Sequence, residues 1–193
     1  TNCVVDAACG SSLSAAHMAC LELQAGRATM VVTGGVDTFN DIFMYMCFTK
    51  TPALSVDGHA KPFDSKAVGT TLGEGVGMVV LKRLDEAEKD GDRIYAVLRG
   101  IGTSSDGKGK SIYAPSAEGQ ARAFEEAYRV AGVSPDTVEL VVAHGTGTTV
   151  GDGIEVEALS RVYRAARVEG TWCALGSVKS MIGHTKAAAG SAS

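Results

Sequence analysis

Cys9 lies in a sequence that could activate a thiol. The segment Asp6–Leu13 (DAACGSSL) predicts a turn of small residues between a strand and a helix, with Cys9 at the first turn of that helix. Unpaired N–H groups at a helix N-terminus favour a thiolate, and the same amides could stabilise an oxyanion on a thioester carbonyl. The alternative is a buried structural cysteine, because cysteine is among the most buried residue types.

His144 follows an apolar strand-like run, residues 138–143, and opens the sequence His-Gly-Thr-Gly-Thr. The carboxyl end of a buried strand is where α/β proteins place chemistry. The glycines of this turn admit a ligand, and the hydroxyls of Thr146 and Thr148 are candidates to bind it. The alternative is a turn whose histidine only satisfies backbone groups.

His184 is expected at or near a helix N-terminus. That dipole disfavours the imidazolium form, so His184 should be a neutral hydrogen-bond donor at neutral pH. Lys179 lies five residues upstream among apolar neighbours, which favours a partly buried ammonium over a solvated one. Glu155 and Asp152 follow the first histidine motif and are candidates to pair with it.

The elements that would position these residues alternate along the chain, which predicts an α/β protein with a sheet buried on both faces. Strands are expected at residues 1–6, 29–36, 75–84, 94–103, 138–143 and 172–175, and helices at 9–24, 85–90, 117–131, 153–166 and near His184. Residues 37–73 contain turn signals, and so long an irregular connection is typical of a functional or inserted element.

The composition of the sequence argues against several classes of protein. The 193 residues are 45% hydrophobic and 21% charged with a net charge of −4, so no basic surface for nucleic acid is expected. The sequence contains no run of 18 apolar residues, so no membrane-spanning segment is predicted. Five cysteines without metal-ligand spacing argue against a disulfide framework or a structural metal and favour a reducing cytosol. The chain starts in a strand-like run and stops in a helix-like run, which we interpret as a piece of a longer protein.

Two glycine-rich segments resemble nucleotide-binding motifs but do not match them fully. Residues 102–109 resemble a phosphate-binding loop, but Gly109 stands where the metal-binding Ser or Thr should be. The glycines of residues 73–77 lead into a strand rather than out of one, so they are not a dinucleotide fingerprint. Neither a GxSxG nor an HExxH sequence occurs, which argues against a serine hydrolase and a zincin.

Three segments together resemble the β-ketoacyl synthase family. They are Asp6–Leu13, His144–Thr148 with Gly151-Asp152, and Gly176–Gly190. Residues 61–64, 73–77 and 81–84 are also similar to the family, so the resemblance covers essentially the whole chain. It implies a thiolase-like, layered αβαβα fold, incomplete here. Residues 1–193 would be a partial ketosynthase domain, with 1–60 the end of the N-terminal half and 61–193 most of the C-terminal half.

The resemblance also implies a role for each residue of this sequence that matches a catalytic position of the family. The resemblance implies that Cys9 is the acyl-accepting nucleophile and that His144 and His184 assist decarboxylation of a malonyl extender. It implies that Lys179 orders the site and that Glu155 is its acidic partner. Two departures exist: Gly10 replaces the more usual Ser or Ala, and Gly153 stands where Pro is common.

The implied activity is that of an acyltransferase of the 3-oxoacyl-[acyl-carrier-protein] synthase type, in a polyketide or polyunsaturated-fatty-acid synthase. No metal or directly bound cofactor is implied, because loss of CO₂ drives the condensation and the phosphopantetheine arm of an acyl carrier protein delivers the substrates. The implied partners are that carrier protein and a second copy of the domain. A cytoplasmic location is expected, with no nucleic acid and no membrane.

Two rival activities stay open. A thiolase-type acyltransferase shares the fold but uses a second cysteine as base, which the set His144, Lys179 and His184 argues against. A non-catalytic partner protein that shapes chain length typically lacks the nucleophile, whereas Cys9 is present. A requirement for malonyl rather than acetyl extender separates the first rival, and thiol labelling of Cys9 separates the second.

Overall fold

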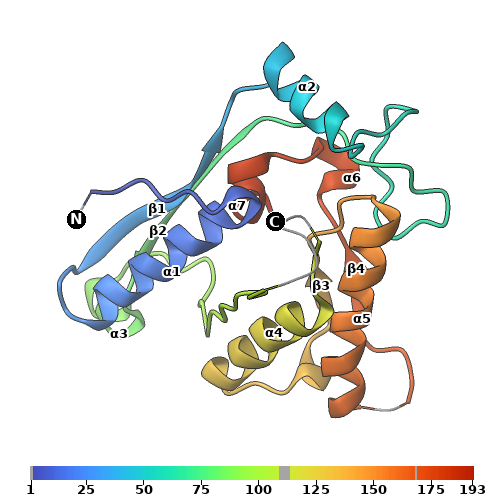
Figure 1. Ribbon diagram of the computed structural model, residues 1–193. Coiled ribbons are helices and arrows are strands. Elements are labelled where there is room, and N and C mark those ends of the chain that lie inside the picture. The colour runs from blue at the N-terminus through green and yellow to red at the C-terminus, as the bar shows by residue number, and fades with distance from the viewer. Residues whose placement is uncertain (1, 109–113, 168) are drawn as a thin grey trace. The chain divides into compact units, whose positions relative to one another are not determined.

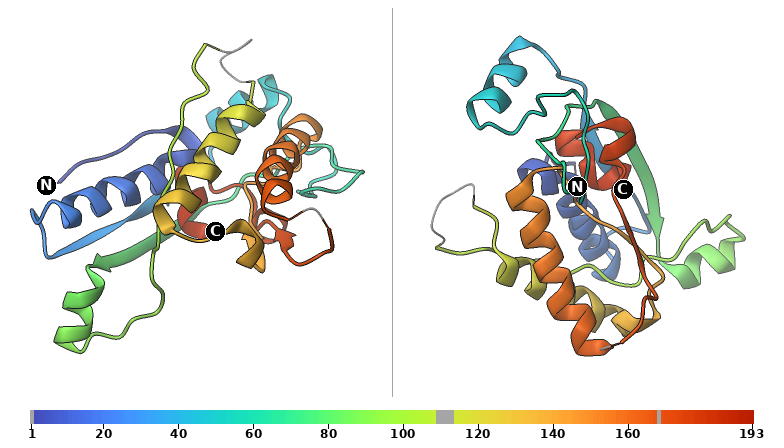
Figure 2. Two further views of the ribbon diagram at one scale, coloured as in Figure 1. Left: turned by 90° about the horizontal axis from the view of Figure 1, so that it is seen from below. Right: turned by 90° about the vertical axis from the view of Figure 1, so that its right-hand side faces the viewer.

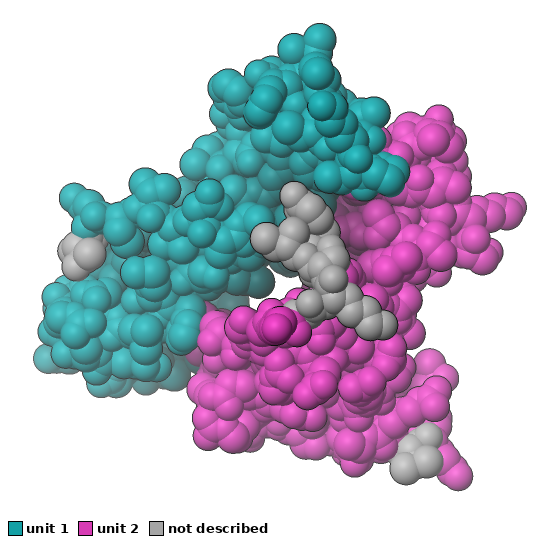
Figure 3. Space-filling model, viewed as in Figure 1, with its two compact units in different colours: residues 1–52, 71–97, 182–193 teal, residues 53–70, 98–181 magenta. Residues whose placement is uncertain are grey.

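The computed structural model describes residues 2–108, 114–167 and 169–193 and divides into two compact units (Figures 1 and 3). Unit 1 comprises Thr1–Pro52, Thr71–Val97 and Ile182–Ser193, and unit 2 comprises Ala53–Thr70 and Leu98–Met181. Thr1, the start of the first expected strand, and Gly109, where the phosphate-loop pattern fails, lie outside the described residues. Each unit therefore combines segments that are far apart in the sequence.

Unit 1 is an antiparallel strand pair with helices against it. Its elements are the 3₁₀ turn η1 (Ala8–Gly10), α1 (Ser11–Gln24), β1 (Met30–Asp37), α2 (Ile42–Lys50), β2 (Gly75–Lys82), α3 (Leu84–Asp90), the 3₁₀ turn η3 (Lys186–Ala188) and α7 (Ala189–Ala192). Strands β1 and β2 pair along their full lengths, with Val32 opposite Val80 and Val36 opposite Val76. Helix α1 packs along β1, as Figure 1 shows.

One face of this strand pair is covered and the other is not. A Cβ on Gly35 would lie 2.7 Å from the Cβ of Ser12 and 2.8 Å from the Cα of Ala188, so only glycine lets α1 and η3 approach β1 this closely. Side chains alternate along a strand, so the opposite face is a separate set of residues. That face is apolar and exposed: Met30, Val32, Val36, Val76, Met78 and Val80. The expected burial on both faces is therefore wrong for this strand pair among the described residues.

Unit 2 pairs two helices with two short parallel strands. Its elements are α4 (Ala117–Ala131), the 3₁₀ turn η2 (Pro135–Thr137), β3 (Leu140–Val142), α5 (Thr149–Ala166), β4 (Ala174–Gly176) and α6 (Lys179–Ile182), whose last residue belongs to unit 1. Helices α4 and α5 lie against each other (Figure 2), and their core is built from Ala121, Ala158 and Val162. The Ser116 hydroxyl caps α4 at its start, and Gly132 ends it in a left-handed conformation.

Most expected elements are present with shifted ends. The helix at 117–131 is confirmed, and the one expected at 153–166 begins earlier, at Thr149. The strands expected at 1–6 and 94–103 are wrong, because the described residues there pair with no neighbouring strand and a strand needs a partner. Helix α2 was not expected, because its sequence IFMYMCFTK is apolar on every side and gives no helical period. Within the described residues, no helix has the length and apolar character that crossing a bilayer needs.

Candidate active site

Cys9 lies in a tight turn where η1 passes into α1, as its sequence predicts. Ala8 has φ +49°, a left-handed conformation that is uncommon for a residue with a Cβ. Two side chains support it. Asp6 accepts from the Ala8 amide (3.0 Å), while the Ser11 hydroxyl donates to the Ala8 carbonyl (2.6 Å) and accepts from the Ala7 amide (2.9 Å). The thiol is thus fixed at the start of a 14-residue helix, where the dipole favours an anion.

His184 is buried in unit 1, with 2% of its surface exposed. Its amide donates to the Thr71 carbonyl (2.7 Å), and its carbonyl accepts from the Gly73 amide (3.0 Å), so the backbone is held in a strand-like pairing. The ring nitrogen Nδ1 accepts from the Lys186 amide at 2.9 Å. Because Nδ1 accepts, the neutral ring carries its proton on Nε2, and His184 is a donor at that atom.

Unit 1 brings the turn of Cys9 and the segment after His184 together. The turn η1 lies against η3, which starts two residues after His184. The Ser191 amide donates to the Ser12 hydroxyl (3.0 Å), which ties α7 to the start of α1. A Cβ on Gly190 would lie 2.5 Å from Cγ of Leu13, so glycine permits this close packing. The helix that follows Cys9 and the segment that follows His184 are therefore fixed to one another.

His144 follows β3 in unit 2, and its backbone is clamped from two sides. The buried carboxylate of Glu155 on α5 accepts from the amides of His144 (2.7 Å) and Gly145 (2.8 Å). The His144 carbonyl accepts from the Lys179 ammonium (2.6 Å) and from the Ser177 hydroxyl (3.1 Å). Lys179 is 2% exposed, which confirms a buried rather than a solvated lysine. The end of β3 is thus a rigid platform for the imidazole.

The imidazole of His144 is held neutral. Desolvation, and then the charge of the Lys179 ammonium, lower its pKa to about 4. His144 as a whole residue is nevertheless exposed to solvent. Nζ of Lys179 lies 3.4 Å from Nδ1, and an ammonium can only donate. The His144 ring therefore also carries its proton on Nε2 at neutral pH.

Asp152 organises the remainder of the glycine-threonine turn. One of its carboxylate oxygens accepts from the Gly147 amide (3.1 Å) and the other from the Phe63 amide (2.7 Å), so it joins this turn to the segment at residues 61–64. The hydroxyls of Thr146 and Thr148, expected to bind a ligand, pair with each other at 2.8 Å. Asp152 and Glu155 share one face of α5 and hold the two ends of the same loop.

The structure divides the expected site residues between the units. Unit 1 holds Cys9 and His184, and unit 2 holds His144, Lys179, Glu155, Thr146 and Thr148. Glu155 is connected to Lys179 through the His144 backbone, while its own two oxygens accept from amides. Sequence reasoning did not single out Lys186, which is buried two residues after His184, because its neighbours in the sequence predict only a turn.

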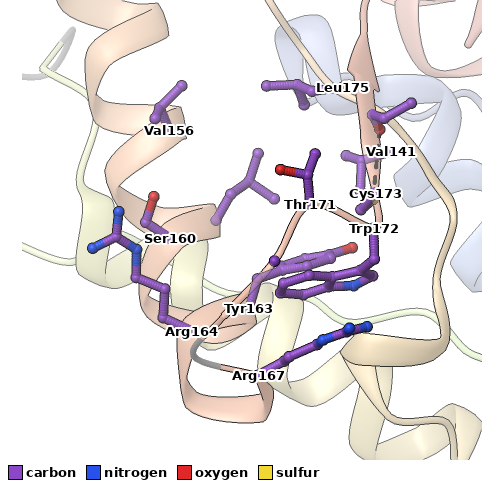
Figure 4. A pocket seen from close by; sticks show the side chains of 13 residues that line it. Val141, Val156, Ser160, Tyr163, Arg164, Arg167, Thr171, Trp172, Cys173 and Leu175 are labelled. Atoms are coloured by element: carbon purple, nitrogen blue, oxygen red, sulfur yellow. Dashed lines mark hydrogen bonds between the residues drawn. The ribbon is translucent and has the colours of Figure 1, made fainter.

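A separate cavity of about 490 Å³ lies in unit 2 between α5 and β4 (Figure 4). Arg164, Arg167, Tyr163 and Trp172 line it, and the ring of Trp172 stacks on that of Tyr163. None of the expected site residues lines this cavity. It therefore contributes nothing to the arrangement around the histidines.

Comparisons with known proteins identify the family. Residues 1–87 match the β-ketoacyl synthase N-terminal domain, and residues 95–193 match the β-ketoacyl synthase C-terminal domain. The chain is 52% identical over 191 residues to a polyunsaturated fatty acid synthase protein of Thraustochytrium sp., covering 98% of this chain and 7% of that protein. It is 45% identical over 186 residues to polyketide synthase PksL of Bacillus subtilis, covering 96% of this chain and 4% of that protein.

Solved structures agree with the sequence relatives. The ketosynthase from module 6 of the bacillaene synthase of Bacillus subtilis superposes with a TM-score of 0.94 at 45% identity, over 97% of this chain and 34% of that chain. A ketosynthase domain of the oxazolomycin synthase of Streptomyces albus superposes with a TM-score of 0.95 at 38% identity, over 99% of this chain and 33% of that one. The chain thus spans less than a tenth of these curated relatives and about a third of the solved ketosynthases. With both family domains matched and a thiolase-like α/β fold, the chain belongs to the β-ketoacyl synthase family.

Proposed function

We propose that this chain is part of a condensing enzyme that joins acyl and malonyl units by decarboxylative Claisen condensation. The observation that carries the proposal is the shared protonation of the two histidines. His144 and His184 each have Nδ1 engaged as an acceptor, so each carries a proton on Nε2. A pair of neutral N–H donors suits an enolate oxygen, which develops negative charge only during the reaction.

The first step is acyl transfer to Cys9. Its thiolate attacks the thioester carbonyl of an acyl group on the phosphopantetheine arm of a carrier protein, and the pantetheine sulfur leaves as a thiolate that takes up the proton released by the Cys9 thiol. A new thioester forms on Cys9 as the old one breaks, so no external oxidant or reductant is needed. Amides at the start of α1 stabilise the oxyanion of the tetrahedral intermediate.

The second step joins the two chains. The bond between the malonyl carboxylate and its α-carbon breaks, CO₂ leaves, and the electron pair passes into an enolate whose oxygen accepts from Nε2–H of His144 and His184. The α-carbon then attacks the acyl carbonyl on Cys9, the carbon–sulfur bond breaks, and the Cys9 thiolate is regenerated. Lys179 holds the His144 ring from the Nδ1 side, and Glu155 holds its backbone.

We also propose the partners of this chain, its place within the complete domain and its location in the cell. The phosphopantetheine arm of an acyl carrier protein carries both substrates, and a second copy of the complete domain is the expected dimer partner. We propose that residues 1–60 end the N-terminal half of the domain and residues 61–193 form most of its C-terminal half. All five cysteines are free thiols, which favours a cytoplasmic location.

Acylation of Cys9 tests the proposal in the full-length synthase. An acyl thioester should add one acyl mass to the wild-type protein, and Cys9→Ala should abolish this adduct and the condensation, while malonyl decarboxylation persists. Cys20→Ala is the matched control on the same helix, since burial raises the pKa of the Cys20 thiol and makes it a poor nucleophile. Condensation by the Cys9→Ala protein would contradict the assignment.

The rival activities have distinct outcomes in the same assays. A thiolase-type enzyme would condense an acetyl thioester without releasing CO₂, whereas we expect an absolute need for malonyl thioester. A non-catalytic partner protein would leave Cys9 unlabelled by iodoacetamide at neutral pH, whereas we expect Cys9 to be labelled ahead of Cys20.

A further inference from the structure

Unit 1 contains a second buried lysine that the proposed reaction does not use. Lys186 follows His184 by two residues and is 7% exposed. A buried ammonium is costly unless it is paired and hydrogen-bonded, so its partners show what the side chain is fixed to.

The ammonium of Lys186 has three acceptors on three different chain segments. It forms an ion pair with Oδ1 of Asp37 at 3.0 Å, at the end of β1. It donates to the side-chain oxygen of Asn40, which precedes α2, and to the Gly73 carbonyl at 3.1 Å, which precedes β2. An ammonium has three N–H groups, so each is matched by an acceptor. The side chain is therefore fixed to the ends of both strands.

The backbone of Lys186 is in an unusual conformation. Its φ is +48°, in the left-handed region, which is unfavourable for a residue with a Cβ. In this conformation the Lys186 amide donates to Nδ1 of His184 at 2.9 Å. The second carboxylate oxygen of Asp37 accepts from the next amide, Ala187, at 3.4 Å. Asp37 thus holds both the side chain and the main chain of this turn.

These contacts form one connected chain from β1 to the imidazole. Strand β1 positions Asp37, Asp37 anchors the Lys186 ammonium, and the anchored residue presents its amide to His184. We propose that Lys186 is a positioning residue for His184: its buried ion pair holds the left-handed turn whose amide keeps the His184 proton on Nε2. This rests on the proposed function, in which that Nε2–H donates to the malonyl thioester oxygen.

The positioning role predicts a split between the two half-reactions. Acyl transfer to Cys9 does not use the His184 proton, whereas decarboxylation does. In the full-length synthase, Lys186→Met keeps an unbranched side chain that is only one heavy atom shorter and removes the ammonium. We expect malonyl decarboxylation, followed as CO₂ release, to fall about tenfold or more, because small misplacement of a catalytic group is expensive. The acyl adduct on Cys9 should form within about twofold of the wild-type rate.

Two further variants sharpen the test. Lys89→Met removes an exposed lysine at the end of α3 in the same unit and should leave both half-reactions unchanged. Asp37→Asn removes the other half of the ion pair and should give the same split. Because the two residues act as a unit, the double variant should be no slower than Lys186→Met by more than about twofold. Should Lys186→Met fail to fold, Asp37→Asn carries the test by itself.

The results that would contradict the positioning role differ from the result that would contradict the proposed function. Equal losses in acylation and decarboxylation would show a purely structural ion pair and overturn the positioning role, and so would unchanged decarboxylation. A wild-type protein that accepts the acyl group but releases no CO₂ from malonyl thioester contradicts the proposed function itself, and the positioning role falls with it.

Discussion

The two histidines reach the same protonation state by different means. In unit 1, His184 has its Nδ1 occupied by a backbone amide, that of Lys186. In unit 2, His144 has its Nδ1 facing the side-chain ammonium of Lys179. A lysine is involved each time, but one contributes an uncharged main-chain donor and the other a charge. The two rings should therefore respond differently to loss of their lysines.

The difference has a physical consequence. A backbone amide fixes which nitrogen accepts but carries no net charge, so it sets the tautomer. A nearby ammonium also repels a proton from the ring, and it contributes to lowering the pKa of His144 to about 4. We infer that unit 2 protects the neutral imidazole against acid by electrostatics, whereas unit 1 fixes its imidazole by backbone geometry.

Removing either ring should have the largest effect, because in the proposed reaction each ring supplies one donor to the enolate. We expect His144→Ala and His184→Ala each to slow malonyl decarboxylation by about 10²–10³-fold, the usual cost of losing one oxyanion donor. CO₂ release from the full-length synthase measures the rate. His59→Ala, at an exposed turn histidine, is the control and should keep the wild-type rate. An unchanged rate in either ring variant would remove that histidine from the enolate role.

Loss of the charge on Lys179 should act on the pH dependence. Lys179→Met removes the ammonium that helps to depress the pKa of His144, so this pKa should rise from about 4 towards 6.5 while desolvation still keeps it below 6.5. Because the proposed reaction needs the neutral ring, the acid limb of the decarboxylation profile should move to higher pH. Profiles from pH 4 to 8 measure this shift. A variant whose acid limb coincides with that of the wild type would show that the charge is irrelevant to His144.

The same lowered pKa bears on stability. In the unfolded chain the ring of His144 titrates near 6.5, whereas in the folded chain it titrates near 4. Between these values the unfolded state binds more protons, so this group makes the fold less stable as the pH falls from about 6.5 to 4. Above 6.5 the ring is neutral in both states and contributes no pH dependence.

Much of this arrangement was accessible from the sequence, and the failures have physical causes. The helix at 117–131 was predictable because its apolar period, a serine cap and a terminal glycine agree. Cys9 at a helix start and His144 after a strand were predictable for the same local reasons. Local signals could not reveal that Glu155 accepts from amides rather than from a cation, because that depends on which loop lies over α5.

Lys186 shows the same limit more sharply. Its sequence neighbours predict only a turn, and its left-handed backbone and its ion pair with Asp37, 149 positions earlier, are products of tertiary packing. The strands expected at 1–6 and 94–103 failed for the converse reason, since their local composition suits a strand but the described residues offer no partner.

The next prediction concerns the two hydrogen bonds by which the Glu155 carboxylate accepts from the amides of His144 and Gly145. Glu155→Gln places an NH₂ group where one of two amides now donates, so a buried donor loses its acceptor at a cost of about 1–3 kcal/mol. We expect a lower midpoint of thermal unfolding and slower decarboxylation. Glu157→Gln on the same helix disrupts only an exposed pair with Arg161 and should cost less than about 0.5 kcal/mol. Equal effects of the two substitutions would show that the clamp contributes nothing.

The smallest effect should come from a glycine on the helix that carries this clamp. Gly153 is exposed within α5, and a Cβ there would meet no heavy atom within 4 Å. Gly153→Ala should therefore stabilise the helix by up to about 1 kcal/mol and leave decarboxylation unchanged. Gly151→Ala is the matched contrast, because its Cβ would lie 2.5 Å from Oγ1 of Thr148 and disturb the loop after His144. A loss of activity in Gly153→Ala would mean that the reaction needs a flexible α5. It would contradict the inference that Glu155 on α5 holds the His144 backbone rigidly.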